Sequence, residues 1–201
     1  MSHDAAKPRL RREARARLRD LSPAARDKAA RRIQDDLASG RFFAEGKTVG
    51  LFAALPSEPA TEPIFQTARE RGCRVALPRM LPGGGLELYR VEDWSRDLEA
   101  NAHGIAEPRP EGGRLVPPGE VDLLCAPGLG FDRAGHRLGR GGGDYDRLLA
   151  TVRPDCLRLG LFFAIQEFDA LPAEAHDQML HAVLTENGLI TVSRTGHKAL
   201  P

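Results

Sequence analysis

Short apolar runs alternate with amphipathic stretches along most of this chain. The apolar runs have the length of buried strands, and glycine, proline or charged residues stand at their ends. They predict strands over residues 47–54, 74–77, 86–91, 121–126, 157–163 and 182–185. A helical pattern over residues 61–71, closed by Gly72, separates the first two strands, and another helical pattern follows Gly143. This alternation predicts an α/β protein with a mostly parallel sheet flanked by helices on both faces.

The chain begins with a pattern that predicts two helices ahead of the first strand. Residues 4–19 are rich in helix-forming residues. Ser22 and Pro23 have the types preferred at a helix N-cap and at the first helical position. They predict a second helix that ends at Gly40.

No internal repeat or low-complexity linker divides the chain, so we expect a single domain over residues 1–201 with an N-terminal helical arm, residues 1–40. Residues 101–120, rich in proline and glycine, predict a long connection. The 201 residues are 41% hydrophobic and 28% charged, which is typical of a globular protein with its own core. No apolar run reaches the ~20 residues of a membrane span. The arginine-rich N-terminus lacks the apolar segment of a secretory signal, and we expect a cytoplasmic protein without membrane partners.

Cysteines and histidines give little indication of a metal site. Cys73, Cys125 and Cys156 stand singly, without the spacing of a zinc site or a disulfide framework. We interpret Cys73 and Cys125 as small hydrophobic residues of strands. His136 and His176 have no partners at metal-ligand spacing, and we expect both at the surface.

Basic residues concentrate in the N-terminal arm. The net charge is +1, yet residues 1–40 hold 11 Lys and Arg residues against 6 Asp and Glu residues. One interpretation is a nucleic-acid-binding module, because clustered cations neutralise phosphates. The arm has no interleaved aromatic residues, which argues against that interpretation. The alternatives are a solvated helix face, or cations that reach a small phosphate ligand.

Residues 127–146, PGLGFDRAGHRLGRGGGDYD, form the most informative stretch, because they stand between a predicted strand and a predicted helix. Glycines let backbone N–H groups approach an anion, and a helix start adds further unpaired donors, so this order predicts phosphate binding. Arg133, Arg137 and Arg140 add positive charge to the same loop. An ordinary flexible connection is the alternative.

Two standard phosphate motifs do not match this loop. A P-loop needs lysine followed by serine or threonine after its last glycine, but Asp144 and Tyr145 follow Gly143. The dinucleotide fingerprint lacks its third glycine in both possible registers, because Arg133 and Asp144 occupy that position. The loop is therefore a different kind of nucleotide site, or none.

Polar residues also follow other predicted strands. Ser57, Glu58 and Thr61 come after the first strand, and Gln166 and Glu167 come after the strand of residues 157–163. Ligands of parallel sheets bind at the carboxyl ends of the strands. We therefore expect these residues near the glycine-rich loop.

Five segments together resemble the 5-formyltetrahydrofolate cyclo-ligase family, also called 5,10-methenyltetrahydrofolate synthetase. They are Lys7-x-x-Leu10-Arg11, Glu58-x-x-Thr61, Gly104-Ile105-x-Glu107-Pro108, the loop of residues 127–143 and the segment of residues 176–188. The segments span nearly the whole chain. The resemblance implies a compact, Rossmann-like α/β fold of the sugar-phosphate isomerase and CoA-transferase type, and we expect a monomer.

The activity implied by the resemblance is the conversion of 5-formyltetrahydrofolate to 5,10-methenyltetrahydrofolate, with ATP and Mg²⁺ required and ADP and phosphate released. The formyl oxygen would attack the γ-phosphoryl group to give an iminium phosphate. The N10 nitrogen of the folate would then close the ring and expel phosphate. Phosphoryl transfer depends mostly on positioning and on charge stabilisation, which suits a glycine-rich loop with cations.

The resemblance also implies roles for particular residues. Arg140 and Lys7 would be catalytic. ATP would bind Lys7, Arg11, Arg137, Leu138, Gly139, Arg140, Gly141, Gly142, Gly143 and Tyr145, the folate would bind Ala53, Glu58, His103, Arg140 and Asp144, and Asp146 with His181 would hold Mg²⁺. Plainer alternatives remain for some of them. Lys7 and Arg11 have i, i+4 spacing typical of one solvated helix face, and Asp146 could pair with Arg147 or Arg140 at the surface.

Three positions depart from the family pattern. Asp144 stands where tyrosine is usual, His103 where an aromatic residue is usual, and His181 where a second metal-binding aspartate is expected. Asp144 has three alternative interpretations. It adds negative charge beside bound phosphates, it takes over the role of the missing metal-binding aspartate, or it is only the N-cap of the following helix. His181 is a poor ligand for Mg²⁺, which prefers oxygen. These departures leave open a diverged paralogue that binds ATP but acts on another substrate or without turnover.

Overall fold

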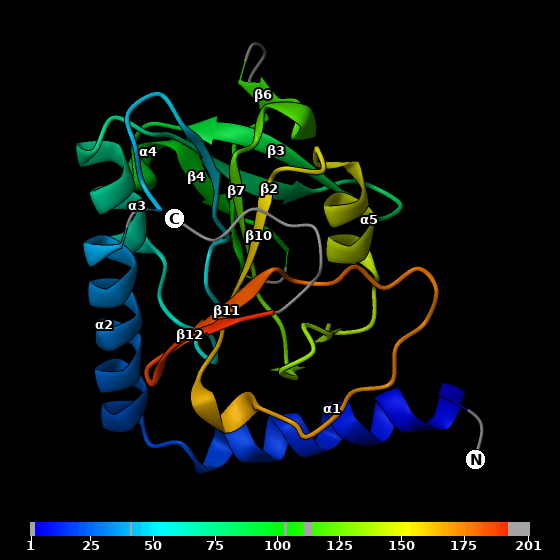
Figure 1. The fold of residues 1–201 in the computed structure, drawn as a ribbon. Helices are drawn as coiled ribbons and strands as arrows, with labels where there is room; N and C mark the ends of the chain where they lie inside the picture. Colours follow the sequence, from blue (N-terminus) through cyan, green and yellow to red (C-terminus); the bar gives the residue numbers. More distant parts are fainter. Residues whose placement is uncertain (1–2, 41, 103, 111–113, 193–201) are drawn as a thin grey trace.

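The computed structural model describes residues 3–192 apart from residues 41, 103 and 111–113. Its helices are α1 (His3–Asp20), α2 (Pro23–Ser39), α3 (Glu62–Glu70), α4 (Trp94–Asp97) and α5 (Asp144–Thr151), with short 3₁₀ helices η1 (Pro118–Glu120) and η2 (Ala164–Gln166). Its strands are β1 (Thr48–Gly50), β2 (Arg74–Met80), β3 (Leu86–Val91), β4 (Leu98–Ala100), β5 (Ala106–Pro108), β6 (Leu115–Val116), β7 (Leu123–Ala126), β8 (Gly130–Phe131), β9 (Arg137–Leu138), β10 (Leu157–Leu161), β11 (Ala182–Thr185) and β12 (Gly188–Thr191) (Figure 1). No helix within these ranges is long and apolar enough to cross a membrane.

One eight-stranded sheet forms the centre of the molecule, in the order β12-β11-β10-β7-β1-β2-β3-β6. The five strands from β11 to β2 in this order run parallel to one another. The strands β12, β3 and β6 are antiparallel additions at the two edges. The predicted mostly parallel sheet is therefore confirmed, with antiparallel edges in which β2–β3 and β11–β12 are joined by short connections.

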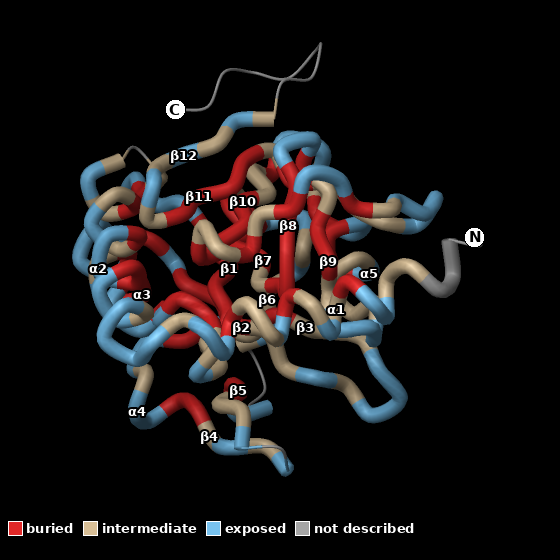
Figure 2. The backbone as a smooth tube through the Cα atoms, turned by 90° about the horizontal axis from the view of Figure 1, so that it is seen from below, coloured by how far each residue is buried: buried red, intermediate tan, exposed pale blue. Residues whose placement is uncertain are grey.

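Helices cover both faces of this sheet, with α2 and α3 on one side and α5 on the other (Figure 1). Successive residues of a strand point to opposite faces. Val75 and Leu77 of β2 accordingly pack in the cluster that contains Ile33 of α2, whereas Ala76 packs in the cluster that contains Leu149 of α5. Figure 2 shows the resulting arrangement, in which buried strands are surrounded by exposed outer surfaces.

The two predicted N-terminal helices are confirmed. The Ser22 hydroxyl accepts a hydrogen bond from the Ala25 N–H at 3.2 Å, and Pro23 begins α2. Leu10, Ala14 and Leu18 form a buried stripe at i, i+4, i+8 spacing along α1. This apolar stripe holds α1 against one end of the sheet, below η2 (Figure 1).

The long connection expected over residues 101–120 is wrong in part. Strand β5 lies within it and pairs with β4, with Leu98 opposite Pro108 and Ala100 opposite Ala106. Strand β6, also within it, pairs with β3. Each of these strands is too short to carry a periodic pattern, so only the pairing partner reveals it.

A small hairpin and the three cysteines also bear on the predictions from the sequence. The glycine-rich stretch contains a small antiparallel hairpin, β8–β9, which the sequence did not predict. The interpretation of Cys125 as a buried strand residue is confirmed, whereas Cys73 is buried but stands one residue before β2 begins; Cys156 is buried as well.

Candidate functional site

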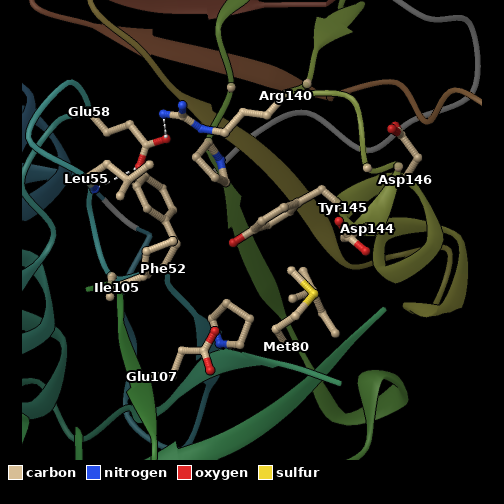
Figure 3. A pocket seen from close by; sticks show the side chains of 18 of the residues that line it. Phe52, Leu55, Glu58, Met80, Ile105, Glu107, Arg140, Asp144, Tyr145 and Asp146 are labelled. Atoms are coloured by element: carbon tan, nitrogen blue, oxygen red, sulfur yellow. Dashed lines mark hydrogen bonds and ion pairs between the residues drawn. The ribbon is translucent and has the colours of Figure 1, made fainter. Parts of the chain in front are cut away.

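A pocket opens at the carboxyl ends of β1, β2 and β7, where a parallel sheet is expected to bind its ligand. One wall comes from the segment after β1 and from β2, β3 and β5, and it is largely apolar. The opposite wall is the glycine-rich loop with the start of α5. The lining residues are Phe52, Ala53, Leu55, Glu58, Pro78, Met80, Leu86, Ile105, Ala106, Glu107, Pro127, Gly128, Arg137, Gly139, Arg140, Gly142, Gly143, Asp144, Tyr145 and Asp146 (Figure 3).

The glycine-rich loop presents backbone donors to this pocket. Gly141 and Gly143 have φ values of +121° and +70°, a backbone region that favours glycine. Between Gly139 and Asp146, no backbone N–H has a hydrogen-bond acceptor among the described residues, and the first helical bond of α5 joins the Arg147 N–H to the Gly143 carbonyl. Unpaired N–H groups at a helix start are suited to an anion such as phosphate.

Arg140 connects this loop to the segment after β1. Its Nη2 donates to Oε1 of Glu58 at 2.7 Å, and the Leu55 N–H donates to Oε2 of the same carboxylate at 2.9 Å (Figure 3). The Glu58 side chain is only 5% exposed, whereas that of Arg140 is 41% exposed. Glu58 is thus a buried anchor for a cation that still reaches the pocket, rather than a simple loop carboxylate.

Arg137 and Asp146 form a second ion pair at the pocket wall. Nη2 of Arg137 lies 2.9 Å from Oδ1 of Asp146, which also accepts the Gln178 N–H at 3.2 Å. The surface pair with Arg147 or Arg140 suggested as an alternative for Asp146 is therefore wrong. The buried Nε of Arg137 has no acceptor among the described residues. The guanidinium carbon lies 5.7 Å from the centre of the Tyr145 ring.

Tyr145, in the first turn of α5, lines the pocket and points its hydroxyl into it (Figure 3). Burial raises the pKa of Tyr145, so its hydroxyl remains a neutral hydrogen-bond donor. The ring adds apolar surface beside Arg137, which suits a planar ligand.

Two cations of the N-terminal arm contact the part of the chain around the pocket: Arg11 contacts the glycine-rich loop, and Lys7 contacts the segment before β11. Nε of Arg11 donates to the Gly139 carbonyl at 3.0 Å. Nζ of Lys7 lies 2.7 Å from Asp177 and 3.0 Å from Glu174, and its side chain is 12% exposed. Burial by itself lowers the pKa of Lys7, but the hydrogen bonds to these two carboxylates outweigh it and raise the pKa. The solvated-face alternative is wrong for both cations.

Asp144 lies in the first turn of α5 and is not its N-cap, which is Gly143. Its Oδ1 accepts the Gly85 N–H at 2.9 Å and the Arg147 Nη2 at 2.5 Å. Asp144 therefore joins α5 to the β2–β3 turn at the edge of the pocket.

Several residues singled out in the sequence lie outside the pocket lining. Arg133 pairs with Glu167 at 2.6 Å on the surface, and Gln166 is buried and donates to the Gly128 carbonyl. Nδ1 of His181 accepts the Arg158 N–H at 3.1 Å. Leu138 is buried beside the loop.

Three histidine positions and one threonine complete this placement. His103 lies outside the described residues. His176 is 69% exposed in its side chain, as expected. The surface position expected for His136 is wrong in part, because its ring is 25% exposed and hydrogen-bonds Asp132 at 2.9 Å. The Thr61 hydroxyl donates to the Phe52 carbonyl. The hydrogen bonds of His136 and Thr61 therefore join parts of the fold to one another and do not point to a metal site.

Sequence reasoning missed the apolar wall of the pocket, formed by Phe52, Met80, Leu86 and Ile105. Phe52 and Met80 stand just after or at the carboxyl ends of β1 and β2, which was a usable signal. Ile105 had no strand-end signal, because β5 was not predicted; its only signal was its place in the segment Gly104-Ile105-x-Glu107-Pro108.

Comparisons with known proteins give this geometry a context. A model of the 5-formyltetrahydrofolate cyclo-ligase family matches residues 3–186. The 5-formyltetrahydrofolate cyclo-ligase of Mycolicibacterium smegmatis is 32% identical over 151 residues, which cover 73% of this chain and 78% of that relative. The Escherichia coli K12 protein of the same name is 30% identical over 173 residues, which cover 85% of this chain and 95% of that relative. The solved 5,10-methenyltetrahydrofolate synthetase of Aquifex aeolicus is similar with a TM-score of 0.81 and 31% identity, covering 97% of this chain and 96% of that one.

Proposed function

Because the chain belongs to the 5-formyltetrahydrofolate cyclo-ligase family, we propose that its pocket converts 5-formyltetrahydrofolate to 5,10-methenyltetrahydrofolate with ATP as co-substrate. One observation carries the proposal: an apolar wall faces a loop of unpaired backbone donors across a single pocket. The apolar wall suits a flat folate ring, and the loop suits a triphosphate.

The loop of residues 139–143 would bind the ATP phosphates. Its unpaired N–H groups are already oriented, so they need no rearrangement when negative charge develops. Arg140 would stabilise the transferring phosphoryl group from the pocket side, while Arg11 holds the loop from the arm side. Lys7 would exchange a carboxylate partner for a phosphate oxygen when ATP binds.

Asp146 fits a magnesium ion held together with phosphates. One of its oxygens is bound by Arg137, and the residue lines the pocket. No group of three or more metal-ligating side chains occurs among the described residues, which suits Mg²⁺ because it uses one or two carboxylates plus phosphates and water. Such an ion, when bound, neutralises triphosphate charge. His181 offers nitrogen and stands outside the pocket lining, so we assign it no metal role.

The chemistry would run in two displacements. The formyl oxygen attacks the γ-phosphorus, the bond from phosphorus to the β-bridging oxygen breaks, and ADP leaves. The N10 nitrogen then attacks the formyl carbon, its proton passes to the leaving phosphate, and the bond from carbon to oxygen breaks with release of that phosphate. Ala53, Phe52 and the neutral Tyr145 hydroxyl would hold the folate in place for both steps and exclude water.

Appearance of methenyltetrahydrofolate absorbance on mixing the protein with 5-formyltetrahydrofolate, ATP and Mg²⁺ tests the proposal. We expect turnover that requires ATP, a loss of about 100- to 1000-fold in Arg140→Ala, and near-normal turnover in Arg133→Ala, whose ion pair lies outside the pocket. ATP binding without turnover in the unaltered protein would sink the proposal in favour of a paralogue with another substrate.

A further inference from the structure

Glu107 is a buried carboxylate in the pocket to which the family resemblance attached no role. It lies on β5, within the Gly104-Ile105-x-Glu107-Pro108 segment, and is 8% exposed. Figure 3 shows it at the opposite end of the pocket from the pair of Glu58 and Arg140, with Phe52 and Ile105 between the two ends.

The carboxylate of Glu107 has spare hydrogen-bonding capacity. Its Oε1 accepts from Nδ2 of Asn101 at 2.8 Å, and Oε2 has no donor among the described residues. The Asn101 side chain also accepts the Ile105 N–H at 3.0 Å, so it braces the carboxylate against its own strand. Oε1 is therefore held by Asn101, while Oε2 is available to a ligand donor.

No cation neutralises Glu107 among the described residues. Arg79 of the neighbouring strand β2 instead binds Glu99 at 2.9 Å and the Pro108 carbonyl at 2.6 Å. Arg140 is bound to Glu58, and Arg137 to Asp146. A buried carboxylate with neither an ion pair nor a full set of donors is costly to the fold, and such a cost persists where a ligand supplies the missing donors.

Glu58, by contrast, already has donors on both oxygens, from Arg140 and from the Leu55 N–H. Both of its oxygens are therefore engaged by the protein itself. Of the two carboxylates at the ends of the apolar wall, Glu107 is the one with an oxygen left for a ligand donor.

We propose that Glu107 binds the edge of the pterin ring that carries the lactam N–H and the exocyclic amino group, with Asn101 as its positioning residue. This inference rests on the proposed function, since it takes 5-formyltetrahydrofolate as the ligand. That ring edge presents two coplanar N–H donors side by side, and a carboxylate accepts such a pair through both oxygens. Ile105 and Met80 lie against the same space and supply apolar contact for the ring.

Equilibrium binding of 5-formyltetrahydrofolate, measured by calorimetry without ATP, tests this assignment. In Glu107→Gln we expect the Kd to rise about 10- to 100-fold, because a charged acceptor is replaced by an amide whose NH₂ opposes the ligand donors. ATP binding should be unchanged. The matched control is Glu99→Gln, directly opposite Glu107 across β4 and β5 but bound to Arg79 and Arg109, in which the folate Kd should not move.

A substrate analogue with methyl in place of the exocyclic amino group separates recognition from structure. The analogue should bind the unaltered protein weakly, and the substitution Glu107→Gln should raise the Kd for the analogue only slightly. Glu107→Gln should also melt no lower than the unaltered protein, because an unpaired buried charge is removed. Two results would overturn the inference. One is an unchanged Kd for 5-formyltetrahydrofolate in Glu107→Gln. The other is that Glu107→Gln raises the Kd for the analogue by the same factor as the Kd for 5-formyltetrahydrofolate.

The same experiment distinguishes this inference from the proposed function. Turnover in the unaltered protein combined with an unchanged Kd in Glu107→Gln overturns the role of Glu107 alone. Folate binding that depends on Glu107, without turnover, overturns the proposed reaction alone.

Discussion

Nη2 of Arg140 donates to Oε1 of Glu58 over 2.7 Å, and this ion pair joins two loops that are 82 residues apart in the sequence. Glu58 is held from its other side by the Leu55 N–H, so the carboxylate has little freedom. The partly exposed Arg140 side chain of the glycine-rich loop is thereby given a fixed direction. The apolar wall and the glycine-rich loop meet at this contact.

The first prediction concerns this pair. Glu58→Gln and Arg140→Met should each lower kcat/KM about 100-fold, and the double variant should be little worse than Arg140→Met. The coupling should be about 1–3 kcal/mol, since Glu58 acts by orienting Arg140. A double-mutant cycle on kcat/KM measures it. The exposed pair of Arg133 and Glu167, at 2.6 Å, is the control and should show activity within about twofold and no coupling. Additive losses at Glu58 and Arg140 would show that the two act independently.

The second prediction is a pH window for the contact between Lys7 and Asp177. Burial alone would raise the pKa of Asp177, but Lys7 lowers it, so this contribution to stability is present above about pH 4 and is lost as the pH falls through the depressed value. The pKa of Lys7 is raised, so its contribution is present below about pH 10.4 and is lost as the pH rises through the elevated value.

Unfolding of the unaltered protein and of Lys7→Met at several pH values tests this window. At pH 7 the variant should be less stable by about 1–2 kcal/mol, and the difference should shrink below pH 4 and above about pH 10.4. Arg9→Met is a suitable control, because Arg9 is 66% exposed on the same helix and should give a small difference. A difference that stays constant from pH 3 to pH 11 contradicts the prediction.

The third prediction separates the charge of Asp144 from its hydrogen bond. Asp144→Asn keeps an acceptor for the Gly85 N–H but removes a negative charge beside the glycine-rich loop, so ATP should bind about fivefold more tightly if this loop holds its phosphates as proposed. Asp144→Ala removes the acceptor too, and hydrogen exchange at the Gly85 amide should accelerate in that variant alone. Calorimetry and exchange measured by NMR give the two readouts. Weaker ATP binding in Asp144→Asn would instead indicate that the carboxylate helps to hold the metal.

The fourth prediction concerns the backbone of the glycine-rich loop. Gly141 has a φ of +121°, and a Cβ added there would have ordinary space, its nearest neighbour being Arg11 at 3.7 Å. Gly141→Ala should therefore destabilise the fold by about 1–3 kcal/mol through backbone strain, and it should weaken ATP binding. Gly119→Ala is the matched control, since Gly119 lacks a positive φ and its Cβ would meet no atom within 4 Å among the described residues. Urea unfolding of Gly141→Ala and Gly119→Ala measures both free energies of unfolding. Equal values for the two variants would refute the role of backbone strain.

Local patterns predicted much of this fold. Ser22, Pro23 and Gly40 mark the ends of α2 because caps depend on neighbouring residues in the chain. The buried strands β1, β2, β7, β10 and β11 were likewise recognisable as short apolar runs. The short strands β4 and β5 were not, because each gains its hydrogen bonds only from the other.

The site divides in the same way. The sequence by itself determined that a glycine-rich loop with three arginines follows a central strand and precedes a helix, because these signals are contiguous in the chain. Only the tertiary structure decided where those arginines point: Arg133 to Glu167 on the surface, Arg137 to Asp146, and Arg140 to Glu58. It also brought Glu107 into the pocket. Identical side chains in one loop acquire different roles because their partners come from distant parts of the chain, and sequence spacing carries no information about which partners folding brings within hydrogen-bonding distance.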